Sequence, residues 1–172
     1  MARFALSFCT LLLSLPMFPQ AVQSHSPLRV AIVGLVHGHV HGFLSQYQRS
    51  PEIEIVGVVE LDAQLRTAGS KRYGFNSSQM FADLEEMIAK THPQAVLVYT
   101  NTYDHRRVVE ICARHGVHVM MEKPLAVSLE DALWMQKAAQ GGNIHVFDTT
   151  QAVETEIIKG VGTSPTIAII SQ

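Results

Sequence analysis

Short apolar segments alternate with stretches of helical periodicity along most of this 172-residue chain, and this alternation constrains the fold more than any other feature. The apolar segments are typical of strands buried on both faces of a sheet: residues 28–34, 52–60, 95–100, 117–122 and 143–147. The stretches between them predict helices over residues 40–49, 62–74, 81–90, 104–116 and 129–140. Connections of this length make neighbouring strands parallel. We therefore expect an α/β fold, a doubly wound parallel sheet of the Rossmann type, over residues 28–147.

Several residues suited to ligand binding come at or directly after the ends of these predicted strands. They are Gly34, Glu60, Thr100 and the run Glu122–Pro124. In open α/β sheets, ligands bind at the carboxyl ends of the strands, where the strand order reverses. We therefore expect these residues to gather on one rim of the sheet.

The loop after the first strand reads IVGLVHGHVHGF (residues 32–43) and leads into the first helix. A dinucleotide pyrophosphate rests in such a loop, on free backbone N–H groups and the positive end of the helix. Gly34 occupies the first glycine position of the G-x-G-x-x-G fingerprint, but Val36 and His39 occupy the second and third, so the fingerprint itself fails. Gly38 and Gly42 offer close backbone approach in a shifted register. The candidate phosphate-loop residues are Gly34, Leu35, Val36, His37, Gly38 and His39.

Glu60 strengthens the nucleotide interpretation because it ends the second predicted strand. A carboxylate at this position accepts hydrogen bonds from the ribose hydroxyls of adenosine and repels a 2′-phosphate. It therefore favours NAD, with NADP the less favoured cofactor. A solvated glutamate at a strand end is the plainer alternative. Asp62 is another acid in this region, and we expect it to cap the following helix.

The three histidines at alternate positions, His37, His39 and His41, leave three interpretations open: a metal site, solvent-facing loop residues, or a lining for the nucleotide pocket. On a helix, His37 and His41 would share a face and His39 would not. No carboxylate or cysteine lies nearby in sequence to complete a transition-metal shell. We therefore expect no metal here and favour a nucleotide loop.

A second motif region spans AVLVYTNTYDHRRVVEICARHGVHVMMEKPLAVSLEDA (residues 95–132) and resembles the Gfo/Idh/MocA-type oxidoreductases, the glucose–fructose oxidoreductase and inositol dehydrogenase family. Members carry a strand, a Thr-Pro-Asn-x-x-His turn, a helix, then Gly-x-His-Val and Glu-Lys-Pro. Here the turn runs from Thr100 to His105, and Asn101 replaces the usual proline. The remaining matches are Gly116, His118, Val119, Glu122, Lys123 and Pro124.

The resemblance implies an NAD(P)-dependent dehydrogenase that acts on a sugar, polyol or related secondary alcohol by hydride transfer. It implies that Lys123 is catalytic, beside the nicotinamide and the reacting alcohol, where a cation stabilises developing negative charge. Glu122 would hold Lys123 and the nicotinamide ribose, and Pro124 would fix the turn. The matching Thr100, Asn101 and His105 would face or flank the cofactor.

The first 24 residues have the form of a secretory signal peptide: Arg3, an apolar stretch from Phe4 to Leu15, two prolines and small residues before Ser24. We therefore expect a periplasmic or secreted protein, with no membrane association after the signal is removed. With a net charge of −2, the chain shows no electrostatic sign of a nucleic-acid partner. Cys9 would leave with the signal, and Cys112 is expected to be a buried, inert thiol.

The resemblance fades after about Phe147, and family members carry a second C-terminal α+β domain that supplies most substrate contacts. We expect residues 148–172 to be an irregular tail, whether a true short tail or the product of truncation or a shifted reading frame. The expected function is the nucleotide-binding part of an oxidoreductase, with a homo-oligomer possible in a full-length form. The alternative is an NAD-binding module or truncated pseudoenzyme without turnover.

Overall fold

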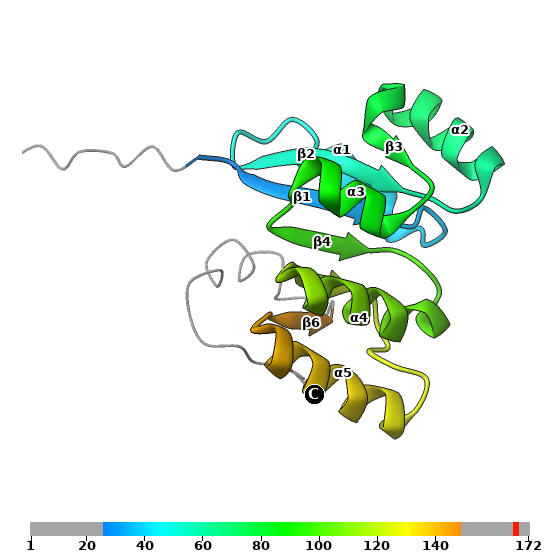
Figure 1. Cartoon of the computed structure of the whole chain (residues 1–172). Coiled ribbons are helices and arrows are strands. Elements are labelled where there is room, and N and C mark those ends of the chain that lie inside the picture. The colour runs from blue at the N-terminus through cyan, green and yellow to red at the C-terminus, as the bar shows by residue number, and fades with distance from the viewer. Residues whose placement is uncertain (1–25, 149–166, 169–172) are drawn as a thin grey trace, which may run out of the picture.

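One parallel sheet organises the molecule, whose computed structural model describes residues 26–148 and 167–168. The strands of this described part are β1 (Leu28–Val33), β2 (Ile53–Val59), β3 (Met80–Phe81), β4 (Ala95–Val98), β5 (His118–Met121), β6 (Val146–Asp148) and β7 (Ile167–Ala168). They are arranged in the order β3-β2-β1-β4-β5-β6-β7, and every neighbouring pair is parallel (Figure 1). The predicted doubly wound Rossmann-type sheet is therefore confirmed. The expected signal segment, residues 1–24, lies outside the described residues.

Helices connect the strands as the alternation predicts. They are α1 (His39–Tyr47), α2 (Ala63–Tyr73), α3 (Leu84–Thr91), α4 (His105–His115) and α5 (Leu129–Gly142), with 3-10 turns η1 (Ser77–Gln79) and η2 (Thr102–Asp104). Two helices end at the glycines that the sequence predicted. Gly74 and Gly116 adopt the left-handed conformation directly after α2 and α4. The side chain of Asp62 accepts two backbone hydrogen bonds at the start of α2, as predicted.

Two details of the sheet differ from the sequence prediction. The helix expected over residues 81–90 begins only at Leu84, because the Asp83 side chain caps it by accepting a hydrogen bond from Glu86 N. Phe81 therefore belongs to β3, a two-residue strand too short to show a periodicity. In the segment expected to be an irregular tail, Ile167 and Ala168 pair with β6. The tail is thus not irregular throughout, and its other residues after Asp148 lie outside the described ones.

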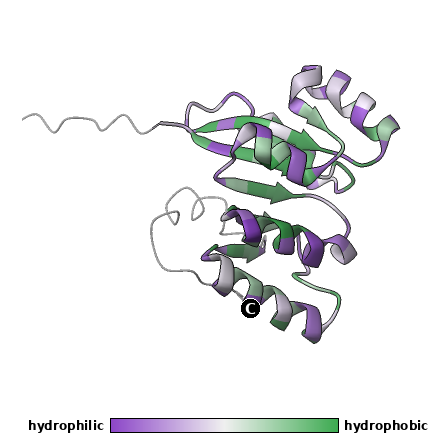
Figure 2. Ribbon diagram, viewed as in Figure 1, coloured by the Kyte–Doolittle hydropathy of each residue, from purple (hydrophilic) through white to green (hydrophobic). Residues whose placement is uncertain are grey.

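Apolar side chains pack on both faces of the sheet and form two cores. One core lies between the sheet and α3, α4 and α5, and includes Met87, Val109 and Met135. The other lies beneath α1 and includes Ile32 and Phe43. The strands are mainly apolar, whereas the outer helix surfaces are largely hydrophilic (Figure 2). No helix of the described part is both long enough and apolar enough to span a membrane.

Cys112 lies in the first of these cores, on the inner side of α4, and is fully buried. Burial raises the pKa of its thiol to about 12. Because the thiolate is the nucleophilic form, this side chain acts as a small apolar core residue, as expected.

Candidate functional site

The strand order reverses between β1 and β4, and the predicted site residues gather at the carboxyl ends of these strands. Gly34 follows β1 with φ +86°, and its N–H donates to Val59 O at 2.8 Å. A Cβ at this glycine would lie 2.7 Å from Thr100 Cγ2 and 2.9 Å from Thr100 N. Only glycine therefore fits, both in conformation and in space, where the chain turns across the end of β4.

Glu60 joins the end of β2 to this turn. Its carboxylate is buried, with the residue 5% exposed. One oxygen accepts from Leu35 N at 2.8 Å and the other from Asp62 N at 3.0 Å. An ionised carboxylate offers about four lone pairs, so these two bonds leave acceptor capacity on both oxygens. Gly34 and Glu60 thus stand side by side on one rim, as the sequence predicted.

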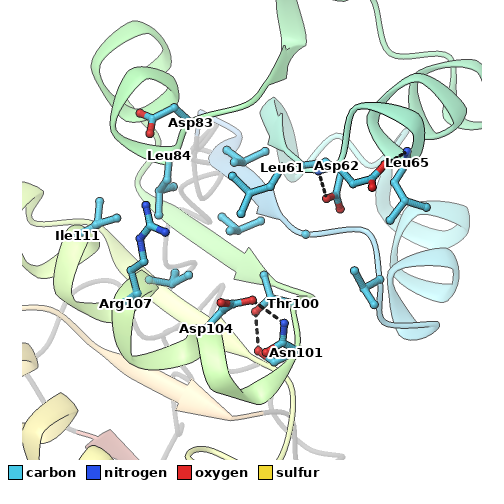
Figure 3. A pocket seen from close by; sticks show the side chains of 16 residues that line it. Leu61, Asp62, Leu65, Asp83, Leu84, Thr100, Asn101, Asp104, Arg107 and Ile111 are labelled. Carbon is cyan, nitrogen blue, oxygen red and sulfur yellow. Dashed lines mark hydrogen bonds between the residues drawn. The ribbon is translucent and has the colours of Figure 1, made fainter.

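A pocket of about 250 Å³ opens beside Glu60, between the ends of β1, β2 and β4 and the first turns of α2, α3 and α4. Figure 3 shows Leu61 and Leu65 on one side of it, Leu84 and Ile111 on another, and Arg107 extending from α4. The remaining lining residues are Val33, Gly34, Val36, Val59, Glu60, Asp62, Asp83, Thr100, Asn101, Asp104 and Val108. Apolar walls with a few polar groups are the usual make-up of a small-molecule site.

Most of this lining was missed by the sequence reasoning. Asp83 and Leu84 reach the rim because they follow the short strand β3, which was not predicted. Arg107 and Ile111 share one face of α4, and Asp104 is its N-cap residue; their spacing of three and four residues is the signal that could have located them.

The phosphate-loop candidates take different positions in the structure. Leu35 offers its N–H to Glu60 while its side chain is buried in the core beneath α1. Val36 is 63% exposed and lines the pocket. Gly38 is the N-cap of α1, which begins without a side-chain cap and without an acidic residue in its first turn. Such a helix start presents N–H groups and a partial positive charge to an anion.

His37 and His39 turn toward the end of β5, where Glu122 is almost fully buried. His39 Nδ1 lies 2.9 Å and His37 Nδ1 3.9 Å from Glu122 Oε1. His41 instead hydrogen-bonds the hydroxyl of Tyr73. No carboxylate lies near these histidines in sequence, but the fold brings together His39 and Glu122, which are 83 residues apart. The condition under which His37 and His41 would share a helical face is not met, because α1 begins only at His39.

Lys123 and Pro124 follow β5 as exposed residues, joined by a cis peptide bond. Lys123 forms no hydrogen bond or ion pair with any residue that the structure describes. Thr100 and Asn101 both line the pocket, and Asn101 Nδ2 donates to Asp104 Oδ2 at 2.6 Å.

His105 is 1% exposed and does not line this pocket. Its Nδ1 donates to Leu125 O at 3.1 Å, so it supports the segment that carries Lys123 and Pro124 from beneath. Burial lowers the pKa of His105 from its ordinary value, and the hydrogen bond to Leu125 partly offsets this effect.

Comparison with known proteins defines the class. The profile of the family described as "Oxidoreductase family, NAD-binding Rossmann fold" matches residues 28–147, and the chain belongs to this family. The predicted family, the fold and NAD as the family's cofactor are thus confirmed.

Two curated relatives show how much of a longer protein the chain matches. It is 32% identical over 116 residues to Glycosyl hydrolase family 109 protein 2 of Akkermansia muciniphila, covering 62% of this chain and 24% of that protein. It is 28% identical over 152 residues to D-glucoside 3-dehydrogenase of Escherichia coli, covering 83% and 42%. The chain therefore spans well under half the length of these relatives.

Two solved structures share the fold. The WlbA dehydrogenase of Chromobacterium violaceum, in complex with NADH and UDP-GlcNAcA, matches with a TM-score of 0.67 at 26% identity, covering 79% of this chain and 39% of that one. An inositol dehydrogenase homolog of Azotobacter vinelandii, complexed with NAD+, matches with a TM-score of 0.63 at 26% identity, covering 72% and 34%.

Proposed function

We propose that this chain binds NAD(H) along the rim of its sheet, as the cofactor-binding part of an oxidoreductase that acts on a sugar, polyol or related secondary alcohol. The observation that carries the proposal is the buried Glu60 carboxylate, which is held by Leu35 N and Asp62 N beside the positive-φ Gly34. This arrangement supplies a sugar-binding acceptor next to a backbone turn that a pyrophosphate can approach closely.

The geometry fits the adenosine part of the cofactor. The spare lone pairs of Glu60 would accept hydrogen bonds from the ribose hydroxyls, and the apolar walls contributed by Leu61, Leu84 and Ile111 would cover the adenine ring. A carboxylate at this point disfavours the 2′-phosphate of NADP by like-charge repulsion. We therefore propose NAD as the preferred cofactor.

The pyrophosphate would rest on the first turn of α1. Gly38 leaves this helix start open, and no acidic residue in the first turn repels an anion. Val36 and the backbone of His37 and His39 would flank it. A Cβ added at Gly38 would meet no heavy atom within 4 Å, so the space in front of the helix start is clear.

At the other end of the rim, the cofactor supplies a nicotinamide that accepts or donates hydride, and the residues of this chain would prepare the alcohol. Lys123, exposed after β5, would orient the substrate hydroxyl and receive or return its proton. Glu122 would hold the adjoining ribose, and Pro124 with the buried His105 would fix the course of the segment.

Substrate selection is proposed to need groups beyond the residues described. Relatives named for sugar chemistry support the substrate class, among them D-glucoside 3-dehydrogenase of Escherichia coli and 1,5-anhydro-D-fructose reductase of Ensifer adhaerens. The chain covers 42% and 27% of these two proteins. The substrate class is therefore part of the proposal, and NAD(H) binding is the part that this chain tests directly.

Export remains a separate proposal that rests on residues 1–24 alone. We propose that this segment directs the protein to the periplasm or the extracellular space. Fractionation of expressing cells, followed by mass measurement of the purified chain, tests it. An exported chain that begins at His25 is expected, whereas an intact chain in the cytoplasm would overturn the assignment.

Calorimetric titration with NAD+ and NADP+ tests the main proposal. We expect NAD+ to bind more tightly than NADP+. Loss of charge-assisted hydrogen bonds, which contribute about 1.5–3 kcal/mol, should weaken NAD+ binding to Glu60→Ala roughly 10- to 100-fold. Glu54→Ala is the matched control, because Glu54 lies on β2, the strand that leads to Glu60, but pairs with Arg29 at the surface. Tighter NADP+ binding, or equal NAD+ affinity in both variants, would contradict the proposal.

A further inference from the structure

We infer that His37, His39 and Glu122 form a binding site for a divalent cation of the zinc type. Each residue offers one ligand atom, and the three atoms lie within 4.8 Å of one another. The inference rests on these side chains alone and does not require the dinucleotide proposal. It also reopens the metal interpretation of the histidine loop, which the sequence had disfavoured for want of a carboxylate.

The donor set matches the chemistry of zinc. Two imidazoles and one carboxylate, with a fourth position left open, make up a common three-ligand zinc set. Ligand atoms bound to one tetrahedral zinc ion at about 2.0–2.2 Å lie roughly 3.4 Å apart. The separations of 2.9 Å and 3.9 Å from Glu122 Oε1 to the two Nδ1 atoms bracket this value. Small rotations of the two rings would complete the geometry.

The backbone of the cluster is held by the ends of the strands. His37 N donates to Tyr99 O at 3.1 Å, and Glu122 N donates to Val98 O at 3.1 Å. His37 Nδ1 also accepts a long hydrogen bond from His39 N, at 3.4 Å, and His39 Nδ1 lies within hydrogen-bonding distance of Glu122 Oε1. The site is therefore anchored on the strand ends, and a bound ion would replace these two hydrogen bonds at the ring nitrogens.

Burial explains why a cation would be favoured. The Glu122 side chain is 3% exposed, while those of His39 and His37 are 64% and 35% exposed. A buried carboxylate loses hydration, and a nearby dication stabilises its charged form. A dication seated between the three groups could enter from the side of the two partly or mostly exposed histidines.

The start of α1 and the neighbouring Lys123 are both positively charged and so repel a cation. We expect coordination by the three side chains to outweigh this repulsion. A helix terminus acts only weakly on a nearby charge at an exposed site. Direct coordination by two imidazoles and a carboxylate is the stronger interaction. Lys123 is exposed and forms no contact that would hold its ammonium against Glu122 in the part of the chain that the structure describes.

Calorimetric titration of the untagged, chelator-treated full chain with Zn²⁺ tests the inference. One ion per chain is expected. His37→Ala, His39→Ala and Glu122→Gln should each weaken binding by more than about tenfold, the lower end of the loss caused even by changes outside the ligand set. The first two replace exposed or half-exposed side chains, and circular dichroism checks that the variants fold.

Two histidines serve as matched controls. His41→Ala changes a nearby histidine of α1 whose ring faces Tyr73, and His115→Ala changes an exposed histidine at the end of α4. Both should bind Zn²⁺ within about twofold of the unaltered chain. Absence of Zn²⁺ binding, unchanged affinity in His39→Ala, or an equal loss in the two controls would each overturn the site.

A parallel NAD+ titration in the presence of chelator separates this inference from the proposed function. Binding of Zn²⁺ without binding of NAD+ would remove the dinucleotide proposal and leave the cation site standing. Binding of NAD+ without binding of Zn²⁺ would do the reverse.

Discussion

The two halves of the rim are built differently. The Glu60 half consists of Gly34, Glu60 and the pocket beside them. Its carboxylate is buried and accepts two backbone hydrogen bonds, so it holds the surrounding backbone together. The Glu122 half, made of His37, His39, Glu122 and Lys123, pairs one buried carboxylate with side chains that are partly or mostly exposed. The acceptor atoms of the Glu60 half are therefore held in place by the fold, whereas the histidine side chains of the Glu122 half lie largely at the surface.

The largest expected effect comes from Gly34→Ala. A left-handed conformation costs a non-glycine residue about 1–2 kcal/mol, and overpacking against Thr100 costs about 1–3 kcal/mol. We therefore expect the free energy of unfolding to fall by about 3 kcal/mol, with loss of NAD+ binding. Denaturant unfolding measures the first effect and calorimetry the second.

Gly42→Ala is the control for this change. Gly42 lies in α1, and a Cβ there would meet no heavy atom of a neighbouring element within 4 Å. It should raise stability by about 0.5–1 kcal/mol, since alanine is the better helix residue. If Gly34→Ala were as stable as Gly42→Ala, the described course of the loop would be wrong.

Removal of the Glu60 carboxylate should come next in size. Glu60→Ala leaves the N–H groups of Leu35 and Asp62 without their acceptor, and an unsatisfied buried group costs about 1–3 kcal/mol. Because the pocket lets water reach the vacated space, we expect a total loss of about 2 kcal/mol in denaturant unfolding. A loss below about 0.5 kcal/mol, the size of an ordinary surface change, would show that the Glu60 carboxylate does not hold the surrounding backbone together.

A smaller effect concerns His105, which supports the segment that carries Lys123. It should appear as a pH dependence of the free energy of unfolding. Burial lowers the pKa of His105 below 6.5, so the unfolded chain takes up a proton there before the folded chain does. The stabilising contribution of the neutral imidazole is complete above pH 6.5 and is lost as the pH falls through the lower pKa of the folded state.

His105→Asn keeps a donor for the Leu125 carbonyl and cannot titrate, so its stability should fall less steeply below pH 6.5. His118, whose pKa is lowered by burial and by His145, contributes a slope of the same sign that the variant retains. Equal slopes for His105→Asn and the unaltered chain in urea unfolding between pH 7 and pH 5 would contradict the assignment.

The smallest effect should be that of Lys123→Ala on the isolated chain. This side chain is exposed and has no partner within the described residues, so we expect stability to change by less than about 0.5 kcal/mol. NAD+ affinity should also change by less than about threefold, because Lys123 is proposed to act on the alcohol. A loss of NAD+ binding equal to that of Glu60→Ala would erase the contrast between the two halves.

The sequence was sufficient for the strand–helix alternation because most strands are short and mainly apolar, and several helices carry local end signals such as Asp62 and Gly116. It also located Gly34 and Glu60, since both follow strands directly and parallel strands share one rim. It could not show that Glu122 contacts His39. That contact forms because β1 and β5, which are far apart in sequence, both pair with β4. The two-residue strand β3 escaped for a different reason: pairing with β2, rather than any periodicity, defines it.

Backbone amide spectra of the isotopically labelled chain, titrated with NAD+, test the central claim most directly. The account predicts shifts concentrated at residues 34–40, at residues 60–62 and at Thr100 and Asn101, with AMP alone reproducing those near Glu60. Shifts centred on the opposite rim, at the amino ends of the strands near His118 and His145, or no shifts at saturating NAD+, would contradict it.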